Sequence, residues 1–222
     1  MFRTFKHLNY KSIAKPQNQQ ELFKVFVKEL LPTQMCLGFS EVWSRQEDFS
    51  KQSPQKRLDY LRKKPVPIVS NKGNDLWMLD RHHRLRAILE LDKDAEAYGY
   101  KVATIDSYEI NESLNFLAQQ GWLYLYDARG KGPYSPQLLP QSLLEMKDDP
   151  YRSLVWKLKK EGLISPESII PYHEFHWGDW LRRKPLPPFN SKNLSPALTI
   201  ARKLACSQGA SHLKGWKGGG GE

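Results

Sequence analysis

One stretch of the sequence decides the fold: Pro65-Val-Pro-Ile-Val69, the polar turn Asn71-Lys-Gly-Asn74, Leu76-Trp-Met-Leu79, and then Asp80-Arg-His-His-Arg-Leu-Arg-Ala-Ile-Leu89. The two apolar runs on either side of the turn predict a β-hairpin. The last segment predicts a helix that presents Leu85, Ile88 and Leu89 to the core and carries His82 and Arg86 on its polar side. The prolines predict a strand at the edge of its sheet, or a proline at the strand's first position.

A charged cluster stands where this hairpin gives way to the helix. Arg81, His82, His83 and Arg84 follow Asp80, which we expect to be the N-cap of the helix. The first turn of a helix has unpaired N–H groups and a partial positive charge, so it attracts anions. Cationic side chains and helix amides at one corner predict an anion site of phosphate size.

Other elements follow from periodicity and from glycine and proline signals. The region between Asp127 and Pro140 is typical of a loop, and Gly121–Tyr126 is strand-like. A strand is expected over 102–108. Helices are expected over 17–31, 47–64, 112–119, 150–161 and 195–206.

Composition limits the class of protein. The 222 residues are 40% hydrophobic and 12% aromatic, which is typical of a folded globule. We find no apolar run of about 18 residues and no secretory leader, so we expect no membrane partner. Cys36 and Cys206 match no metal or redox spacing, and we expect reduced thiols in a cytoplasmic protein.

Positive charge is concentrated toward the end of the chain. The net charge is +10, and the residues from Leu181 onward hold eight Lys and Arg against one acid, a net +7. Such a tail can contact nucleic acid without sequence preference, or can serve only to keep the protein in solution. The composition leaves both alternatives open.

Four motifs in this order resemble the ParB/sulfiredoxin superfamily, and more closely its ParB-like nuclease branch. They are Leu31-Pro-Thr-Gln34 with Gly38 and Glu41-Val42, the segment 80–87, Asp148-Asp-Pro-Tyr-Arg-Ser-Leu154, and His173-Glu-Phe-His-Trp-Gly-Asp-Trp-Leu-Arg182. The resemblance covers about residues 30–183. It implies a bacterial protein with a compact α/β (α+β) fold, a mixed sheet with flanking helices, and a helical C-terminal extension. We expect a nucleotide-binding core over 1–110, a helical and aromatic extension over 111–183 that packs on the core, and a basic, partly flexible tail over 184–222.

The resemblance also implies what the corner binds, namely the phosphates of ATP or another nucleotide. Arg84, Arg86 and Ala87 match the Arg-x-Arg-Ala end of the motif in partitioning proteins. His82 stands where sulfiredoxins have their catalytic cysteine, which excludes sulfinic-acid reduction. Arg81 stands where the superfamily often has glycine, so the arginine side chain would have to replace close backbone contact with a phosphate. No helix-turn-helix follows the corner, so a DNA-sliding clamp is not expected.

Candidate residues can then be given roles. Glu41 is the expected general base, and His82 or His83 an acid or base. Asp80 and Glu174 are expected ligands of Mg²⁺. Residues expected to hold the nucleotide or its phosphates are Gln34, Asp80, Arg81, Arg84, Arg86, Arg152 and Ser153.

Each candidate also has a purely structural interpretation. Asp80 can simply cap its helix, and Asp148 and Asp149 can cap the helix that begins at Pro150. The cluster around His173 and Glu174 can be a packed aromatic element with buried ion pairs.

Three functions fit these residues. The favoured one is a phosphotransferase that uses a nucleoside triphosphate or diphosphate on a small hydroxyl-bearing acceptor. The second is a Mg²⁺-dependent nuclease or phosphodiesterase, which needs clustered carboxylates. The third is a non-catalytic module that binds nucleotides or DNA, with the basic tail supplying most of the binding. The nearly neutral body favours a small ligand.

Overall fold

The computed structural model describes residues 10–166 and 172–218. The chain folds into two compact units that interleave along the sequence. Of the described residues, the first unit contains 10–35, 45–125 and 133–146, and the second contains 36–44, 126–132, 147–166 and 172–218. The mixed α/β class predicted from the sequence is confirmed.

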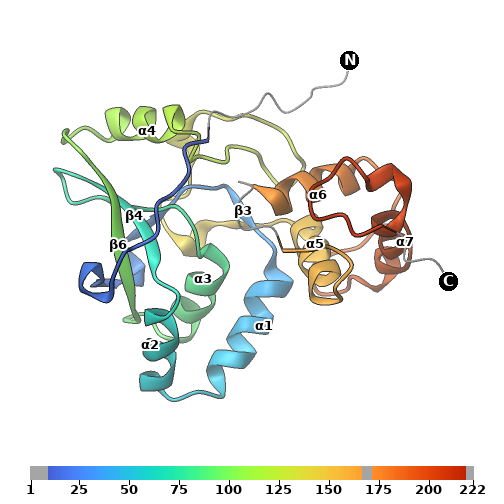
Figure 1. Ribbon diagram of the computed structural model, residues 1–222, viewed down its shortest axis with the longest axis horizontal. Coiled ribbons are helices and arrows are strands. Elements are labelled where there is room, and N and C mark those ends of the chain that lie inside the picture. Colours follow the sequence, from blue (N-terminus) through green and yellow to red (C-terminus); the bar gives the residue numbers. More distant parts are fainter. Residues whose placement is uncertain (1–9, 167–171, 219–222) are drawn as a thin grey trace. The chain divides into compact units, whose positions relative to one another are not determined.

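A five-stranded sheet in the order β1-β6-β4-β5-β2 forms the centre of the first unit. Strand β4 pairs in parallel with β6 and antiparallel with β5, and β1 pairs antiparallel with β6. Helices α2 and α3 cover one face of β4 and β6, and α4 covers the opposite face (Figure 1). The strands are β1 (Phe23–Phe26), β2 (Leu30–Pro32), β4 (Val66–Asn71), β5 (Leu76–Met78) and β6 (Glu96–Ile105), and the helices are α2 (Pro54–Arg62), α3 (His82–Leu91) and α4 (Ile110–Gln119).

The predicted β4–β5 hairpin and the helix after it are confirmed, but the edge position of β4 is wrong. Pro67 is the second residue of a central strand. The registered pairing of β4 with β5 runs from Ile68 to Ser70 and stops before Pro67, which has no N–H to donate to β5. The carbonyl of Pro67 accepts from the Leu79 N–H.

The helix expected over 17–31 is wrong. The chain there forms a 3₁₀ turn (Gln19–Glu21), β1, a second 3₁₀ turn (Val27–Glu29) and β2. Val25 and Val27 are buried whereas Lys24 and Phe26 are exposed, which is the two-residue alternation of a strand. A short, dense apolar run satisfies both periods, and β-branched valines favour the strand.

The single helix expected over 47–64 is also wrong, because two helices share the region. Helix α1 (Phe39–Ser50) ends before Ser53, and the Ser53 hydroxyl accepts from the Lys56 N–H as the N-cap of α2. Pro54 then takes the first helical position. The strand-like segment 121–126 forms only an isolated bridge between Gln34 and Tyr124. Its Trp122 and Leu123 are buried in the core beneath α4.

The second unit is largely helical. The element bounds are β3 (Cys36–Leu37), β7 (Lys147–Asp148), α5 (Pro150–Lys160), α6 (His173–Arg182) and α7 (Ser195–Cys206). Leu154, Leu158, Trp177 and Leu181 form its core, each with no exposed area. The helix expected over 195–206 is confirmed as α7. Its Ala197 and Ala201 are buried in this core, so this part of the expected tail is packed.

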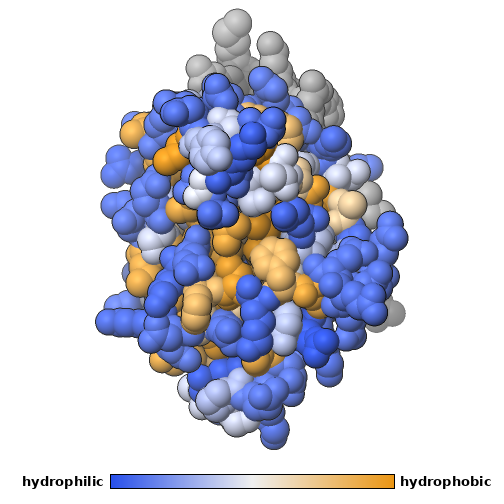
Figure 2. All heavy atoms as spheres, turned by 90° about the vertical axis from the view of Figure 1, so that its left-hand side faces the viewer, coloured by the Kyte–Doolittle hydropathy of each residue, from blue (hydrophilic) through white to orange (hydrophobic). Residues whose placement is uncertain are grey.

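Apolar side chains gather in the middle of one face of the molecule, surrounded by hydrophilic ones (Figure 2). Large apolar side chains of the first unit that remain exposed include Phe26, Tyr108, Ile110 and Leu138. No helix in the described ranges has the length and hydropathy that crossing a membrane requires.

Burial sets the acid–base behaviour of Cys36 in the second unit. Its pKa is raised to about 12 by burial, with a further contribution from Asp149 and opposition from Arg152. Because the folded-state pKa lies above the unfolded value, the stability linked to this thiol is complete below about pH 9 and is lost as the pH rises toward 12. We expect the free energy of unfolding, measured in urea, to fall less steeply over this range in Cys36→Ala than in the wild type. Cys206→Ala should retain the wild-type slope, and equal slopes in all three proteins would contradict this assignment.

Candidate functional site

The corner between β5 and α3 has an unusual backbone. Arg81, and not Asp80, is the N-cap of α3, and its φ of 78° is left-handed. Its side chain makes no capping hydrogen bond. The prediction that Asp80 caps the helix is therefore wrong by one residue. Glycine adopts this conformation without strain, which explains why glycine suits this position, whereas an arginine held there points to a role for its side chain.

Asp80 is bound to its neighbour. Its Oδ1 accepts from the Arg81 backbone N–H at 2.6 Å, and its Oδ2 accepts from Arg81 Nη1 at 2.7 Å. The Asp80 side chain is 55% exposed and that of Arg81 is 35% exposed. Both carboxylate oxygens of Asp80 therefore accept hydrogen bonds from Arg81. The N-cap of α3 has no side-chain hydrogen bond.

Arg84 carries the strongest signal of an incomplete site. Its guanidinium carbon lies 5.2 Å from the centroid of the Tyr60 ring. Its Nε and Nη1 atoms are buried without a hydrogen-bond partner, and so is Nε of Arg81. Buried N–H groups are nearly always satisfied, so three such groups on neighbouring guanidiniums need an explanation. An acceptor with several oxygens would satisfy them.

Electrostatics at this corner favour an anion. Burial lowers the pKa of Arg84, and the positive charges of Arg45 and Arg81 lower it further, against a raising contribution from Tyr60. A cation that is destabilised by desolvation and by two like charges gains from any bound anion.

Tyrosines complete the corner. The pKa of Tyr10 is raised to about 12 by burial and by the negative charge of Asp80. Burial also raises the pKa of Tyr100, with Asp80 adding to the effect and Arg81 opposing it. Tyr10, Tyr60, Tyr100 and Arg45 were missed by sequence reasoning. They come from four separate segments, and no local motif marks them.

His82 and Arg86 have structural roles. His82 Nε2 accepts from the Thr33 N–H at 3.2 Å, and because a backbone N–H can only donate, this nitrogen carries no proton. Arg86 donates to the Leu143 carbonyl and forms an ion pair with Glu90. Both side chains are buried, so their expected place on a polar helix face is wrong. His83 is half-buried in the first turn of α3.

Gln34 is held near this corner by its backbone. It follows Thr33, whose hydroxyl donates to the Met78 carbonyl at the end of β5. Gln34 itself forms the bridge with Tyr124 and is buried. The structure therefore places Thr33, the residue before Gln34, against His82 in the first turn of α3.

The other predicted site residues belong to the second unit. The guanidinium carbon of Arg152 lies 3.7 Å from the Phe175 ring centroid, and its Nη2 lies 3.6 Å from Glu174 Oε2. Ser153 Oγ accepts from the Ser40 N–H and shares a hydrogen bond with Ser191. These contacts make Arg152 and Ser153 parts of a packed network. Asp149 caps α5 through the Tyr151 N–H, as its position before Pro150 predicts.

The expected metal ligands do not fit a metal site. Asp80 is bound to Arg81, and Glu174 pairs with Lys159 and Arg152. No group of three or more His, Cys, Asp or Glu in residues 10–166 and 172–218 could hold a metal ion. Glu41, the expected base, is buried in the first turn of α1 and belongs to the second unit.

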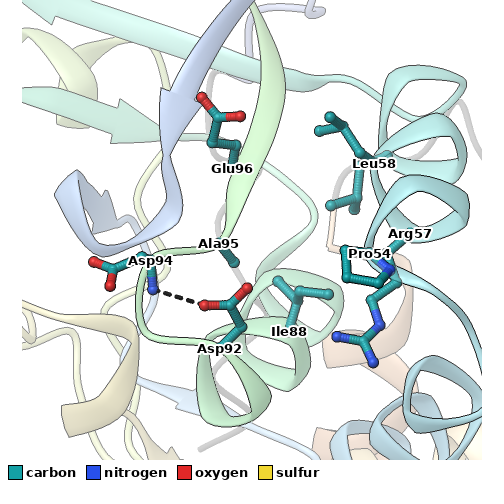
Figure 3. Close-up of a pocket in the computed structure, with 9 residues that line it drawn as sticks. Pro54, Arg57, Leu58, Ile88, Asp92, Asp94, Ala95 and Glu96 are labelled. Atoms are coloured by element: carbon teal, nitrogen blue, oxygen red, sulfur yellow. Dashed lines mark hydrogen bonds between the residues drawn. The ribbon is translucent and has the colours of Figure 1, made fainter.

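A pocket of about 160 Å³ lies elsewhere in the first unit, between α2, α3 and the start of β6. Apolar Leu58, Leu61 and Ile88 line it together with Arg57 and three carboxylates. Figure 3 shows Asp92 accepting a hydrogen bond from the Asp94 N–H at its edge. None of the predicted site residues lines this pocket.

Comparison with known proteins agrees with the fold. Residues 23–183 match the family model described as "Putative ParB-like nuclease". The chain belongs to this family. Among solved structures, this family member is similar to protein Atu1540 from Agrobacterium tumefaciens, with a TM-score of 0.76 and 29% identity over 89% of this chain and 98% of that one. No curated protein matches.

Proposed function

We propose that this ParB-like chain binds the phosphates of a nucleotide at the β5–α3 corner. The observation that carries the proposal is the set of three buried guanidinium nitrogens without hydrogen-bond partners, Nε and Nη1 of Arg84 and Nε of Arg81. The absence of a side-chain cap on α3 adds to it, because a helix N-terminus favours negative charge.

A phosphate matches these donors better than a single carbonyl or hydroxyl. Arginine offers several N–H groups in a fixed plane, and phosphate accepts them in pairs. Tyr10, Tyr60 and Tyr100 supply aromatic surface near the same arginines, which suits a ligand that carries a base or sugar.

For the reaction, we propose phosphoryl transfer to a small hydroxyl-bearing acceptor. Binding, orientation and charge neutralisation supply most of the catalysis in such transfers, and arginines provide the last. Cleavage of nucleic acid, the activity in the family's description, is the alternative. It favours clustered carboxylates, and the residues that the structure describes offer no such cluster of three.

The first test is replacement of Arg84. We expect Arg84→Ala to weaken ADP binding at least about tenfold, because a charge-assisted hydrogen bond is worth about 1.5–3 kcal/mol. Isothermal titration calorimetry with ADP and ATP, with and without Mg²⁺, measures the change.

Arg62→Ala is a matched control. The Arg62 guanidinium carbon lies 5.3 Å from the Tyr98 ring centroid, almost the same arrangement as Arg84 over Tyr60. The Arg62→Ala substitution removes the same charge and the same type of aromatic contact as Arg84→Ala. It should leave ADP binding unchanged. Equal loss in both variants, or no binding by the wild type, would overturn the proposal.

Turnover assays then separate the two activities. Phosphoryl transfer predicts nucleotide consumption that depends on an added hydroxyl acceptor and is lost in Arg84→Ala. Nuclease activity predicts DNA cleavage without added nucleotide.

A further inference from the structure

We infer that Asp80 is an internal anion that occupies part of the ligand's place, and that the site therefore takes terminal phosphate groups in preference to internal phosphodiesters. This inference rests on the proposed function, because it assigns the chemistry of the same corner.

The contacts of Asp80 are those that an anionic ligand would make. One carboxylate oxygen accepts a backbone N–H and the other accepts a guanidinium N–H, both from Arg81. Backbone amides and arginine forks are the donors that bind phosphates in proteins. Asp80 is not the N-cap of α3, and its two carboxylate oxygens both accept from Arg81.

The arrangement leaves the corner with more cations than anions. Asp80 pairs with Arg81, while Arg84 keeps two buried N–H groups without an acceptor. Burial and the positive charge of Arg81 both disfavour the charged form of Arg84. One carboxylate therefore neutralises only part of the combined charge of Arg81 and Arg84.

The charge of the ligand decides whether it can displace Asp80. A phosphodiester carries one negative charge, the same as the carboxylate, and Asp80 competes from the adjacent position in the chain at high effective concentration. A terminal phosphate carries nearly two charges at pH 7 and three acceptor oxygens. It can satisfy the Arg81 donors and the Arg84 N–H groups together, which an internal diester cannot do at the same cost.

The test is Asp80→Asn, with pyrophosphate as the probe. The carboxamide oxygen can still accept the Arg81 N–H, so the backbone is preserved, but the negative charge is gone. We expect pyrophosphate to bind about fivefold more tightly, the factor expected on removing a competing exposed ion pair. Asp80→Ser, which also keeps an acceptor, serves if the first variant does not fold.

Asp92→Asn is the matched control, because it removes the same charge at the opposite end of α3, where Asp92 is the C-cap. It should leave pyrophosphate binding unchanged. The wild type should also bind pyrophosphate more tightly than an oligonucleotide that lacks terminal phosphates.

The outcomes separate this inference from the proposed function. If the wild type binds pyrophosphate and Arg84→Ala does not, but Asp80→Asn binds equally or more weakly, the inference is wrong and the proposed function stands. Tighter binding of the oligonucleotide would overturn the preference for terminal phosphates. Absence of binding by the wild type and all variants would overturn both.

Discussion

Arg182→Ala is expected to lower the free energy of unfolding by about 3–5 kcal/mol, because it leaves a buried carboxylate without its main partner. Arg182 Nη2 lies 2.8 Å from Asp149 Oδ2, and the two side chains are 14% and 7% exposed. Arg182 also donates to the Ala128 carbonyl and lies over the Tyr151 ring. Urea unfolding followed by tryptophan fluorescence measures the loss.

The pH dependence of this loss has a definite sign. Burial raises the pKa of Asp149, while Arg182 and Arg152 oppose the rise. Without Arg182 the folded state binds a proton on Asp149 more readily than the unfolded state does. We therefore expect the deficit of Arg182→Ala to shrink as the pH is lowered from neutral toward the unfolded value of about 4.

Arg183→Ala is the control for Arg182→Ala. Arg183 forms an ion pair with Asp179, but its own side chain is 54% exposed, so the change should cost at most about 1 kcal/mol. Adding Asp149→Asn to Arg182→Ala should recover part of the lost stability. Equal costs for the two arginines would contradict the assigned role of the buried pair.

The second large effect is expected for Gly38→Ala. A Cβ at this position would lie 2.6 Å from the Ser153 backbone nitrogen and 2.8 Å from the Arg152 carbonyl carbon. Both obstacles are backbone atoms at the start of α5, so neither can rotate away. We expect a loss of about 3 kcal/mol or more, at the upper end for overpacked sites. The measurement is the urea midpoint with an unchanged m-value.

Gly178→Ala is the matched control for Gly38→Ala. Gly178 lies inside α6, and the nearest atoms to its Cβ would be 3.9 Å away, on Tyr151. The substitution should be neutral or should stabilise the helix by about 0.5–1 kcal/mol. A tolerated Gly38→Ala would show that β3 and α5 are not in close contact.

Elements with explicit start signals could be predicted from the sequence, and dense apolar runs could not. Helix α5 was predicted because Asp149 and Pro150 mark its first turn, and α3 because its leucines recur at helical spacing. The helix prediction for residues 17–31 was wrong because their apolar positions fit a strand as well as a helix. Only the pairing of β1 with β6 and of β2 with β5 determines which element forms.

The candidate site shows the same division. Arg81 and Arg84 were assigned to the anion corner, and the structure places their unpartnered N–H groups there. His82 and Arg86 were misplaced because they share the spacing of Leu85 and Leu89, so the stripe that they form with these leucines is the buried one. That error was visible in the sequence. The sequence did not show which further side chains contribute to the corner, because only the tertiary fold brings them to Arg81 and Arg84. These side chains are Tyr10, Tyr60, Tyr100 and Arg45.

The most direct test of the central claim follows the arginine side chains themselves. NMR spectra of the Nε–Hε groups, assigned with Arg81→Lys, Arg84→Lys and Arg62→Lys, are recorded while ADP is added. We predict that the Nε–Hε signals of Arg81 and Arg84 shift together and saturate at one ligand per chain, while that of Arg62 stays in place. Shifts confined to other arginines, or an Arg84 signal that does not move while ADP binds, would contradict the assignment of this corner as the phosphate site.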